Sequence, residues 1–308
     1  MSDLSLGGKV RTLSAEDLGI GFTATAAEGK AASSPDTPEI DATDPAVIEV
    51  IKLLDQYSGV LLSGPPGTSK TYLAREVAHV LSEGEEKRQA FTQFHPSYQY
   101  EDFMEGYRPK PEGSFEHRWG VFTRLCNDAA DHLEDVYVMV IDELSRGDAA
   151  RVFGEALTYV ERSKRGMVFE LPSGKKATIP VNVKVIATMN PLDRGVDEVD
   201  AAFERRFAKK TMDPDPDLLE KRLIQNGLPD DLRGPLLAWF RDINEQKTPG
   251  VKIGHAYFWD ATDEASMRAL WEYQVQYHVE RVFRNEEKTR ERFQAKWEAI
   301  FVAAVEDD

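Results

Sequence analysis

The feature that most constrains the fold of this chain is the glycine-rich segment Gly64-Pro65-Pro66-Gly67-Thr68-Ser69-Lys70-Thr71. It follows the short apolar run 59–62, which is typical of a buried strand, and it precedes 71–81, where the apolar spacing predicts a helix. A glycine-rich loop in this position is typical of a phosphate-binding loop, in which successive backbone N–H groups and the helix N-terminus hold phosphates. We therefore expect all eight residues to bind a nucleotide.

Two side chains of this loop add specific chemistry, and a third residue departs from the usual pattern. Lys70 supplies a positive charge for the outer phosphates, and the Thr71 hydroxyl can ligate magnesium. Ser69 stands where the usual loop has a glycine before the lysine. Because serine is small, we expect phosphate binding to survive this change.

Two further apolar runs end in polar residues. The run 136–141 (VYVMVI) leads into Asp142 and Glu143, and the run 183–190 (VKVIATMN) ends at Asn190. We expect Asp142 to hold the magnesium and Glu143 to polarise an attacking water, since one acid neutralises metal charge while the other acts as a base. The Asn190 amide can hydrogen-bond both that water and a terminal phosphate oxygen. Strands that alternate with helices predict a parallel α/β sheet with its ligand at the carboxyl ends of the strands.

Two adjacent arginines, Arg205 and Arg206, end the predicted helix 199–207 (VDAAFERRF). Their position suits neutralisation of transition-state charge across a subunit boundary. Taken alone, the pair would favour a solvated basic helix end. The order of the other elements favours the catalytic interpretation.

Charge and element pattern divide the chain into three parts. The formal net charge is −16, which argues against nucleic-acid binding over the whole surface but leaves room for a local basic strip. Residues 1–50 hold nine acidic and three basic residues, a net −6, so we predict a disordered acidic tail over 1–44. Strand signals stop after Pro214. We therefore predict an α/β nucleotide-binding domain over 45–213 and an all-helical domain over 214–308.

The single cysteine, Cys126, excludes an internal disulfide and a cysteine-based zinc site, and it fits a reducing cytoplasm. No apolar run approaches the roughly 20 residues that a membrane helix needs. We therefore expect a cytoplasmic protein without a membrane partner.

Together, these elements resemble an AAA+ ATPase module: a P-loop NTPase with a parallel sheet flanked by helices, followed by a small all-helical lid domain. Longer tracts resemble the McrB family, the NTP-hydrolysing motors of modification-dependent restriction complexes. The similarity runs from about residue 45 to the end and is carried by FHPSYQYEDFMEGYRP (94–109), IDELSRGDAARVFGEAL (141–157), MNPLDRGVDEVDAAFERRF (189–207) and IGHAYF (253–258).

The resemblance assigns further residues. The family tract Met-Asn-x-x-Asp-Arg is matched at Asn190, Asp193 and Arg194, and in the family it serves catalysis at the nucleotide shared by neighbouring subunits. Arg205 corresponds to an arginine finger, with Arg206 beside it. His255, in IGHAYF, falls where the lid would fold over the nucleotide, so it either contacts the base or a phosphate or packs within the lid.

The function that the resemblance implies is Mg²⁺-dependent hydrolysis of ATP or GTP by a ring, most simply a hexamer, that powers a McrC-like nuclease subunit. ATP is favoured because most AAA+ modules use it and no Asn-Lys-x-Asp guanine motif is visible. DNA would be reached through a partner or the ring pore, where Lys175 and Lys176 of the predicted hairpin 168–181 either contact DNA or are solvated. The alternatives are a MoxR-like remodelling chaperone that acts on proteins without DNA, and a nucleotide-dependent regulatory switch.

Overall fold

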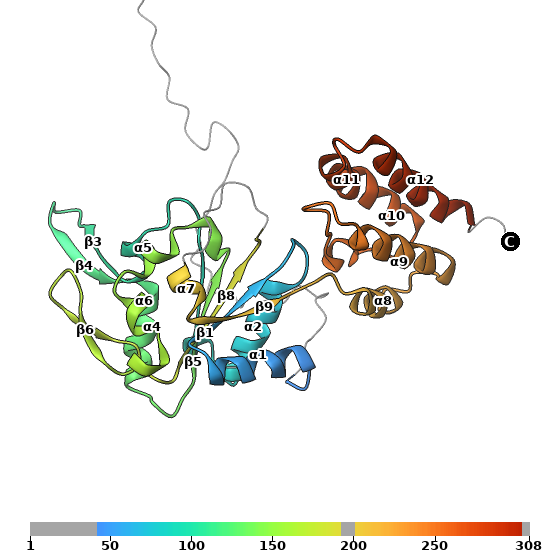
Figure 1. Cartoon of the computed structure of the whole chain (residues 1–308). Coiled ribbons are helices and arrows are strands. Elements are labelled where there is room, and N and C mark those ends of the chain that lie inside the picture. Colours follow the sequence, from blue (N-terminus) through green and yellow to red (C-terminus); the bar gives the residue numbers. More distant parts are fainter. Residues whose placement is uncertain (1–41, 192–200, 304–308) are drawn as a thin grey trace, which may run out of the picture. The chain divides into compact units, whose positions relative to one another are not determined.

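A computed structural model of the chain describes residues 42–191 and 201–303 (Figure 1). All elements below lie in one compact unit, Glu39–Asp308. Nearly all of the predicted acidic tail, 1–44, lies outside the described residues, so the tail stays a prediction.

In the described part of the chain, a five-stranded parallel sheet has the order β2-β5-β8-β1-β9. Its strands are β1 (Gly59–Ser63), β2 (Gln89–Gln93), β5 (Tyr137–Asp142), β8 (Val183–Met189) and β9 (Phe207–Thr211). The helices of this part are α1 (Pro45–Gln56), α2 (Lys70–Leu81), α3 (Tyr100–Phe103), α4 (Val121–Ala130), α5 (Ala149–Phe153), α6 (Ala156–Tyr159) and α7 (Ala201–Glu204), with the short 3₁₀ turns η1 (Glu86–Arg88), η2 (Leu144–Arg146) and η3 (Arg162–Lys164). Two antiparallel hairpins complete it, β3 (Glu105–Pro109) with β4 (Phe115–Trp119), and β6 (Val168–Glu170) with β7 (Lys176–Thr178).

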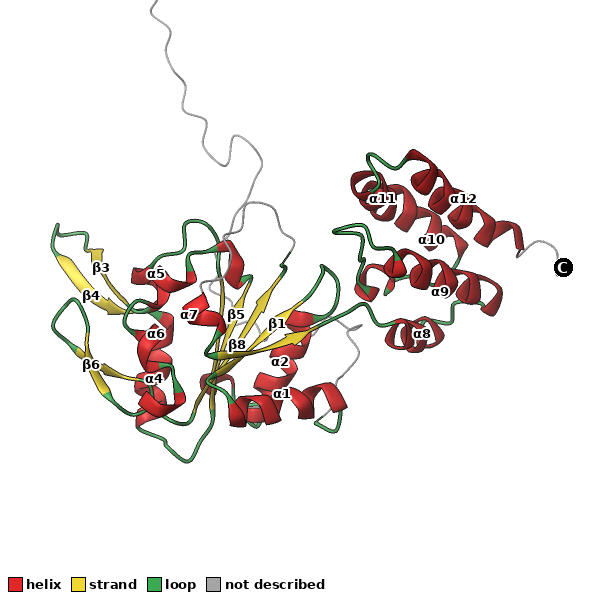
Figure 2. Ribbon diagram, viewed as in Figure 1, coloured by secondary structure: helices red, strands yellow, loops and turns green. Residues whose placement is uncertain are grey.

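The three central strands, β5, β8 and β1, are the apolar runs of the sequence, and nearly all their residues are buried. Helices lie against the sheet (Figure 2). On one face, α1 begins at the Asp44 cap and packs Val50 and Leu54 with α2 residues such as Leu73 and with β1. The predicted parallel sheet with flanking helices is confirmed.

Two features of this part differ from the sequence prediction. Apolar residues at helical spacing over 148–161 predict one continuous helix, but that helix is interrupted at Gly154, whose φ of 50° and ψ of −128° end α5. The Tyr100 ring lies 2.7 Å from where a Cβ on Gly154 would be, so this aromatic contact and the glycine enforce the break together. The edge strands β2 and β9 were not predicted, because their sequences QAFTQ and FAKKT are too polar to read as buried runs.

The C-terminal elements are α8 (Pro216–Gln225), α9 (Asp230–Glu245), the 3₁₀ turn η4 (His255–Phe258), α10 (Glu264–Leu270), the π-helical turn η5 (Trp271–Val275), α11 (Gln276–Val282) and α12 (Glu287–Ala303). They share an apolar core in which Trp239 packs edge-on against Trp271 and Trp297. Helices therefore follow the sheet as predicted, while the domain boundary at 213/214 stays a prediction. None of the helices in the described residues is long and apolar enough to span a membrane.

Candidate functional site

The topology brings the predicted site residues to one edge of the sheet. Strand β8 lies between β5 and β1, and all three run parallel. Asp142 ends β5, Asn190 follows β8, and the glycine-rich loop follows β1. Because the carboxyl ends of parallel strands meet at one edge, residues far apart in the sequence converge there.

A cavity of 370 Å³ occupies this edge, a volume typical of small-ligand sites. Its wall combines the loop, the strand ends and part of the helical segment. The lining residues are Pro66, Gly67, Thr68, Ser69, Lys70, Thr71, Tyr72, Glu143, Arg146, Thr188, Asn190, Ala256 and Trp259. The rings of Tyr72 and Trp259 meet edge-on at 6.5 Å and offer an aromatic wall.

The Lys70 ammonium lies against the loop that precedes it. Its Nζ donates to the carbonyl oxygens of Gly64, at 2.9 Å, and Pro65, at 2.7 Å. The Thr68 hydroxyl also donates to the Pro65 carbonyl, at 2.9 Å. These bonds hold the ammonium against the loop. The oxygens of a bound phosphate would replace the carbonyl oxygens as its partners.

The residues expected to hold a magnesium ion are adjacent. The Thr71 hydroxyl donates to Asp142 Oδ1 at 2.7 Å, and the Thr188 hydroxyl donates to the same oxygen at 2.5 Å. Hard divalent cations prefer oxygen ligands of this kind, so the residues fit the ion. The described residues contain no group of three or more His, Cys, Asp or Glu side chains suited to a metal. Phosphate oxygens and water would therefore complete the coordination of an ion here.

Glu143 has a special backbone conformation and is held by two local contacts. Its backbone adopts a left-handed conformation, with φ of 53°, which is uncommon for a residue other than glycine and frequent at functional sites. Its N–H donates to the Thr188 hydroxyl at 3.2 Å, and Arg146 Nε lies 3.1 Å from Glu143 Oε2. The carboxylate is thus fixed at the cavity wall by an arginine that lines the same cavity.

Thr188 is the site residue that sequence reasoning missed. It stands two positions before Asn190 on β8, so the two side chains share one face of the strand. Both are buried and both line the cavity. The alternation along the strand was a signal that Thr188 accompanies Asn190.

His255 lies directly against the glycine-rich loop. Its ring is almost fully buried, its Nε2 lies 2.9 Å from the Ser69 hydroxyl, and its Nδ1 accepts from the Asp215 N–H at 3.2 Å. Both ring nitrogens are therefore engaged with the protein. The direct contact of His255 with a base or phosphate stays a prediction, and we propose another role for this ring below.

The burial of His255 predicts a pH dependence of stability. Burial lowers the pKa of His255 to about 4, below the ordinary 6.5, and the Asp215 carboxylate opposes this effect. Because the folded chain favours neutral imidazole, the contribution is complete above pH 6.5 and is lost as the pH falls toward 4. Between about pH 7.5 and pH 5 the loss amounts to about 2 kcal/mol. We expect urea unfolding of the wild type to show this loss and that of His255→Gln to lack it.

His278 serves as the internal control for that measurement. Its pKa is also lowered by burial, so its protonation destabilises both proteins equally. The difference between the wild type and His255→Gln isolates the contribution of His255. Equal pH slopes in the two proteins would contradict the prediction.

The two predicted arginines point to different environments. Arg205 is exposed, while Arg206 is 8% exposed, with its Nε 3.6 Å from Glu161 Oε2. Phe207 pairs with Gly59, so the arginines lie beside the amino end of β1, while the glycine-rich loop follows its carboxyl end about 13 Å away. Both arginines line a second cavity, of 520 Å³, which shares no residue with the first.

Comparison with known proteins identifies the type of domain that contains this sheet. Residues 59–207 match the model of the AAA domain of the dynein-related subfamily. The chain carries an AAA domain of this subfamily.

Two curated relatives extend the similarity beyond the AAA domain. The Type IV methyl-directed restriction enzyme EcoKMcrB subunit of Escherichia coli (strain K12) is 34% identical over 226 residues, which cover 68% of this chain and 49% of that protein. The Type II restriction enzyme BsuMI component YdiS of Bacillus subtilis (strain 168) is 27% identical over 195 residues, covering 48% of this chain and 55% of that protein. The resemblance to the McrB family is confirmed. The chain spans about half the length of these relatives.

Two predicted site residues, Asp193 and Arg194, lie outside the described residues, so their roles in the AAA domain stay predictions. The structure brings together Lys70, Thr71, Asp142, Glu143 and Asn190, with Thr188 among them. It leaves Arg205 and Arg206 at the opposite edge of the same domain.

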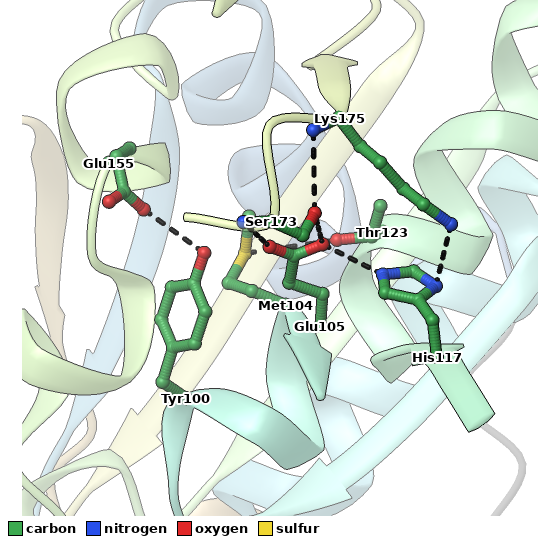
Figure 3. A network of polar contacts seen from close by, with 8 residues as sticks. All are labelled: Tyr100, Met104, Glu105, His117, Thr123, Glu155, Ser173 and Lys175. Carbon is green, nitrogen blue, oxygen red and sulfur yellow. Dashed lines mark hydrogen bonds and ion pairs between the residues drawn. The ribbon is translucent and has the colours of Figure 1, made fainter. Parts of the chain in front are cut away.

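The two hairpins of the AAA domain are joined by a polar network (Figure 3). Glu105 on β3 accepts from Ser173, in the turn between β6 and β7, and from His117 on β4 at 2.8 Å. Burial raises the pKa of Glu105, but the hydrogen bonds from Ser173 and His117 outweigh it and lower the pKa overall. Lys175 Nζ donates to His117 Nδ1 at 2.9 Å and also lies over the Trp119 ring. Lys175 therefore contacts the other hairpin, an arrangement that the sequence did not predict.

Proposed function

We propose that this chain is the nucleotide-hydrolysing subunit of a McrB-type restriction complex and that it acts as a ring of copies, most simply six. One observation carries the proposal. A single cavity is lined by the phosphate-binding loop, by Thr71, whose hydroxyl donates to Asp142, and by Glu143, while the exposed Arg205 lies at the far edge of the sheet. Because the cavity and Arg205 lie at opposite edges of the sheet, the active site is completed by the arginine of a neighbouring copy.

The roles of the residues follow from their positions. Lys70 and the loop N–H groups bind the outer phosphates, and Thr71 with Asp142 holds Mg²⁺, which neutralises phosphate charge. Glu143 orients the attacking water and accepts its proton, and Asn190 hydrogen-bonds the water and the terminal phosphate. The Tyr72 and Trp259 rings form the apolar wall for the nucleobase. We propose ATP as the substrate, with GTP as the alternative.

The proposed partner is a McrC-like nuclease subunit that reads or cuts DNA. Support comes from the two relatives, which are a restriction enzyme subunit and a restriction enzyme component. DNA would then meet the chain through that partner or through the ring pore.

The decisive experiment is purification of the chain with the product of the neighbouring gene, followed by hydrolysis assays with ATP and GTP, each with and without DNA. We expect Mg²⁺-dependent turnover of one nucleotide, faster with partner and DNA present. Turnover that depends on a protein partner but not on DNA would instead support a remodelling chaperone. Absence of hydrolysis of both nucleotides by the complex would refute the proposed activity.

Substitution of Lys70 tests the binding half of the proposal. Loss of a charged hydrogen-bond donor costs about 1.5–3 kcal/mol, so we expect Lys70→Ala to weaken nucleotide binding about 10- to 100-fold. Titration with a fluorescent nucleotide analogue measures the dissociation constant. Lys87→Ala, which removes an exposed lysine outside the cavity, is the matched control and should leave binding unchanged.

A further inference from the structure

Ser69 adopts a conformation that a serine enters at a cost. Its φ of 59° and ψ of 23° lie in the left-handed region, immediately before Lys70 and the start of α2. Glycine populates this region freely, whereas a residue with a Cβ loses about 1 kcal/mol there. A serine at this position therefore needs a compensating interaction, and its hydroxyl provides one.

The partner of that hydroxyl is His255, 186 residues away in the chain. The backbone N–H of Asp215 donates to Nδ1 of His255, so Nδ1 carries no hydrogen. The neutral ring therefore carries its hydrogen on Nε2, which donates to the Ser69 hydroxyl at 2.9 Å. The bond has a defined direction, from the helical segment to the loop.

Backbone contacts place the same segment against the back of the loop. Gly254 N–H donates to the Pro66 carbonyl at 3.1 Å, and Ala256 N–H donates to the Gly67 carbonyl at 2.9 Å. A Cβ on Gly254 would lie 2.0 Å from the Gly67 carbonyl carbon, so only glycine allows this approach. Three consecutive residues, 254–256, thus hold the loop at Pro66, Gly67 and Ser69, of which Ser69 is the nearest to Lys70.

We infer that Ser69 and His255 form a latch by which the C-terminal helical segment holds the phosphate-binding loop in its binding conformation. His255 acts through Ser69 and is a positioning residue, with no contact to the nucleotide. Because of this latch, the conformation of the loop depends on the position of residues 254–256. A displacement of these residues therefore changes the affinity of the loop for phosphate. This inference deepens the proposed function and rests on it for its nucleotide readout.

The chain offers a matched set of variants. Ser69→Ala removes the hydroxyl and keeps the Cβ. His255→Asn retains an acceptor near Nδ1 for the Asp215 N–H but lacks a donor near Nε2, while His255→Gln retains a donor near Nε2. Binding of fluorescent ATP and GTP analogues is measured for each variant and for the Ser69→Ala/His255→Asn double variant.

We expect Ser69→Ala and His255→Asn each to weaken binding about 5- to 10-fold, the cost of one hydrogen bond. The double variant should be no weaker than either single variant, and His255→Gln should stay within about twofold of the wild type. Multiplication of the two single effects in the double variant, or an equal loss in His255→Gln and His255→Asn, would overturn the latch.

Hydrogen exchange of the backbone amides of residues 67–71 without nucleotide tests the latch independently of the proposed function. Ser69→Ala and His255→Asn should raise exchange in this segment, and His255→Gln should not. If the wild type binds neither nucleotide, the proposed function fails while the exchange result still decides the latch. Unchanged exchange in Ser69→Ala and His255→Asn refutes the latch alone.

Discussion

Glu143→Gln is expected to lower nucleotide turnover about 10²- to 10⁴-fold while leaving nucleotide binding intact, because a general base contributes a factor of this size. Glutamine keeps the length of the side chain and can still meet Arg146, whose Nε now lies 3.1 Å from Glu143 Oε2. It cannot accept the proton of the attacking water. Thr71 and Asp142, the proposed magnesium ligands, and the loop are unchanged, so affinity should stay within about threefold of the wild type.

Single-turnover hydrolysis and nucleotide titration measure the two parts of this prediction separately. Glu204→Gln, an exposed glutamate that pairs with Lys209 away from the cavity, is the matched control and should turn over at the wild-type rate. A Glu143→Gln protein that loses affinity along with turnover would contradict the assigned role. It would indicate that Glu143 supports the phosphate site itself.

The parts of the site that the sequence predicts are those with local signals. The glycine-rich loop, the strand-end pair Asp142 and Glu143, and Asn190 each follow an apolar run long enough to mark a buried central strand. A parallel sheet then brings the ends of these strands together whatever the intervening segments do. For this reason the arrangement around the cavity could be predicted without knowledge of the edge strands.

The parts that could not be predicted depend on contacts between distant segments. The helix break at Gly154 depends on the Tyr100 ring, and the position of Lys175 depends on His117 in another hairpin. Edge strands β2 and β9 lack apolar runs because one side of each has no neighbouring strand. The Ser69–His255 bond was the hardest contact to predict, because the sequence presents Ser69 only as a departure from glycine and His255 only as a lid residue.

Arg205→Ala is expected to lower turnover about 10³- to 10⁵-fold, the effect of removing an arginine that neutralises transition-state charge from a neighbouring subunit. The assignment to Arg205 alone follows from burial, because Arg206 is turned toward Glu161 of its own chain. Arg205 lies beside the amino end of β1, on the opposite edge from its own cavity. If Arg205 acts on a nucleotide as we propose, that nucleotide is bound by another copy.

A mixing experiment distinguishes this arrangement from a structural role. Arg205→Ala chains keep Glu143 in their cavity, and Glu143→Gln chains keep Arg205, so a junction between one of each in the right order is complete. Each variant alone should be nearly inactive, whereas an equal mixture should recover up to about a quarter of the wild-type turnover, the share of complete junctions in a randomly mixed ring. Lys209→Ala, which removes an exposed cation close to Arg205, is the control and should stay active.

Failure of the mixture to recover turnover, with both variants assembled, would place Arg205 outside the shared site. Full activity of Arg205→Ala alone would do the same. Recovery, by contrast, requires that a cavity from one chain and an arginine from another meet, since neither variant contains both. The same result would therefore establish that the active site lies between copies, so that a single chain cannot complete it alone.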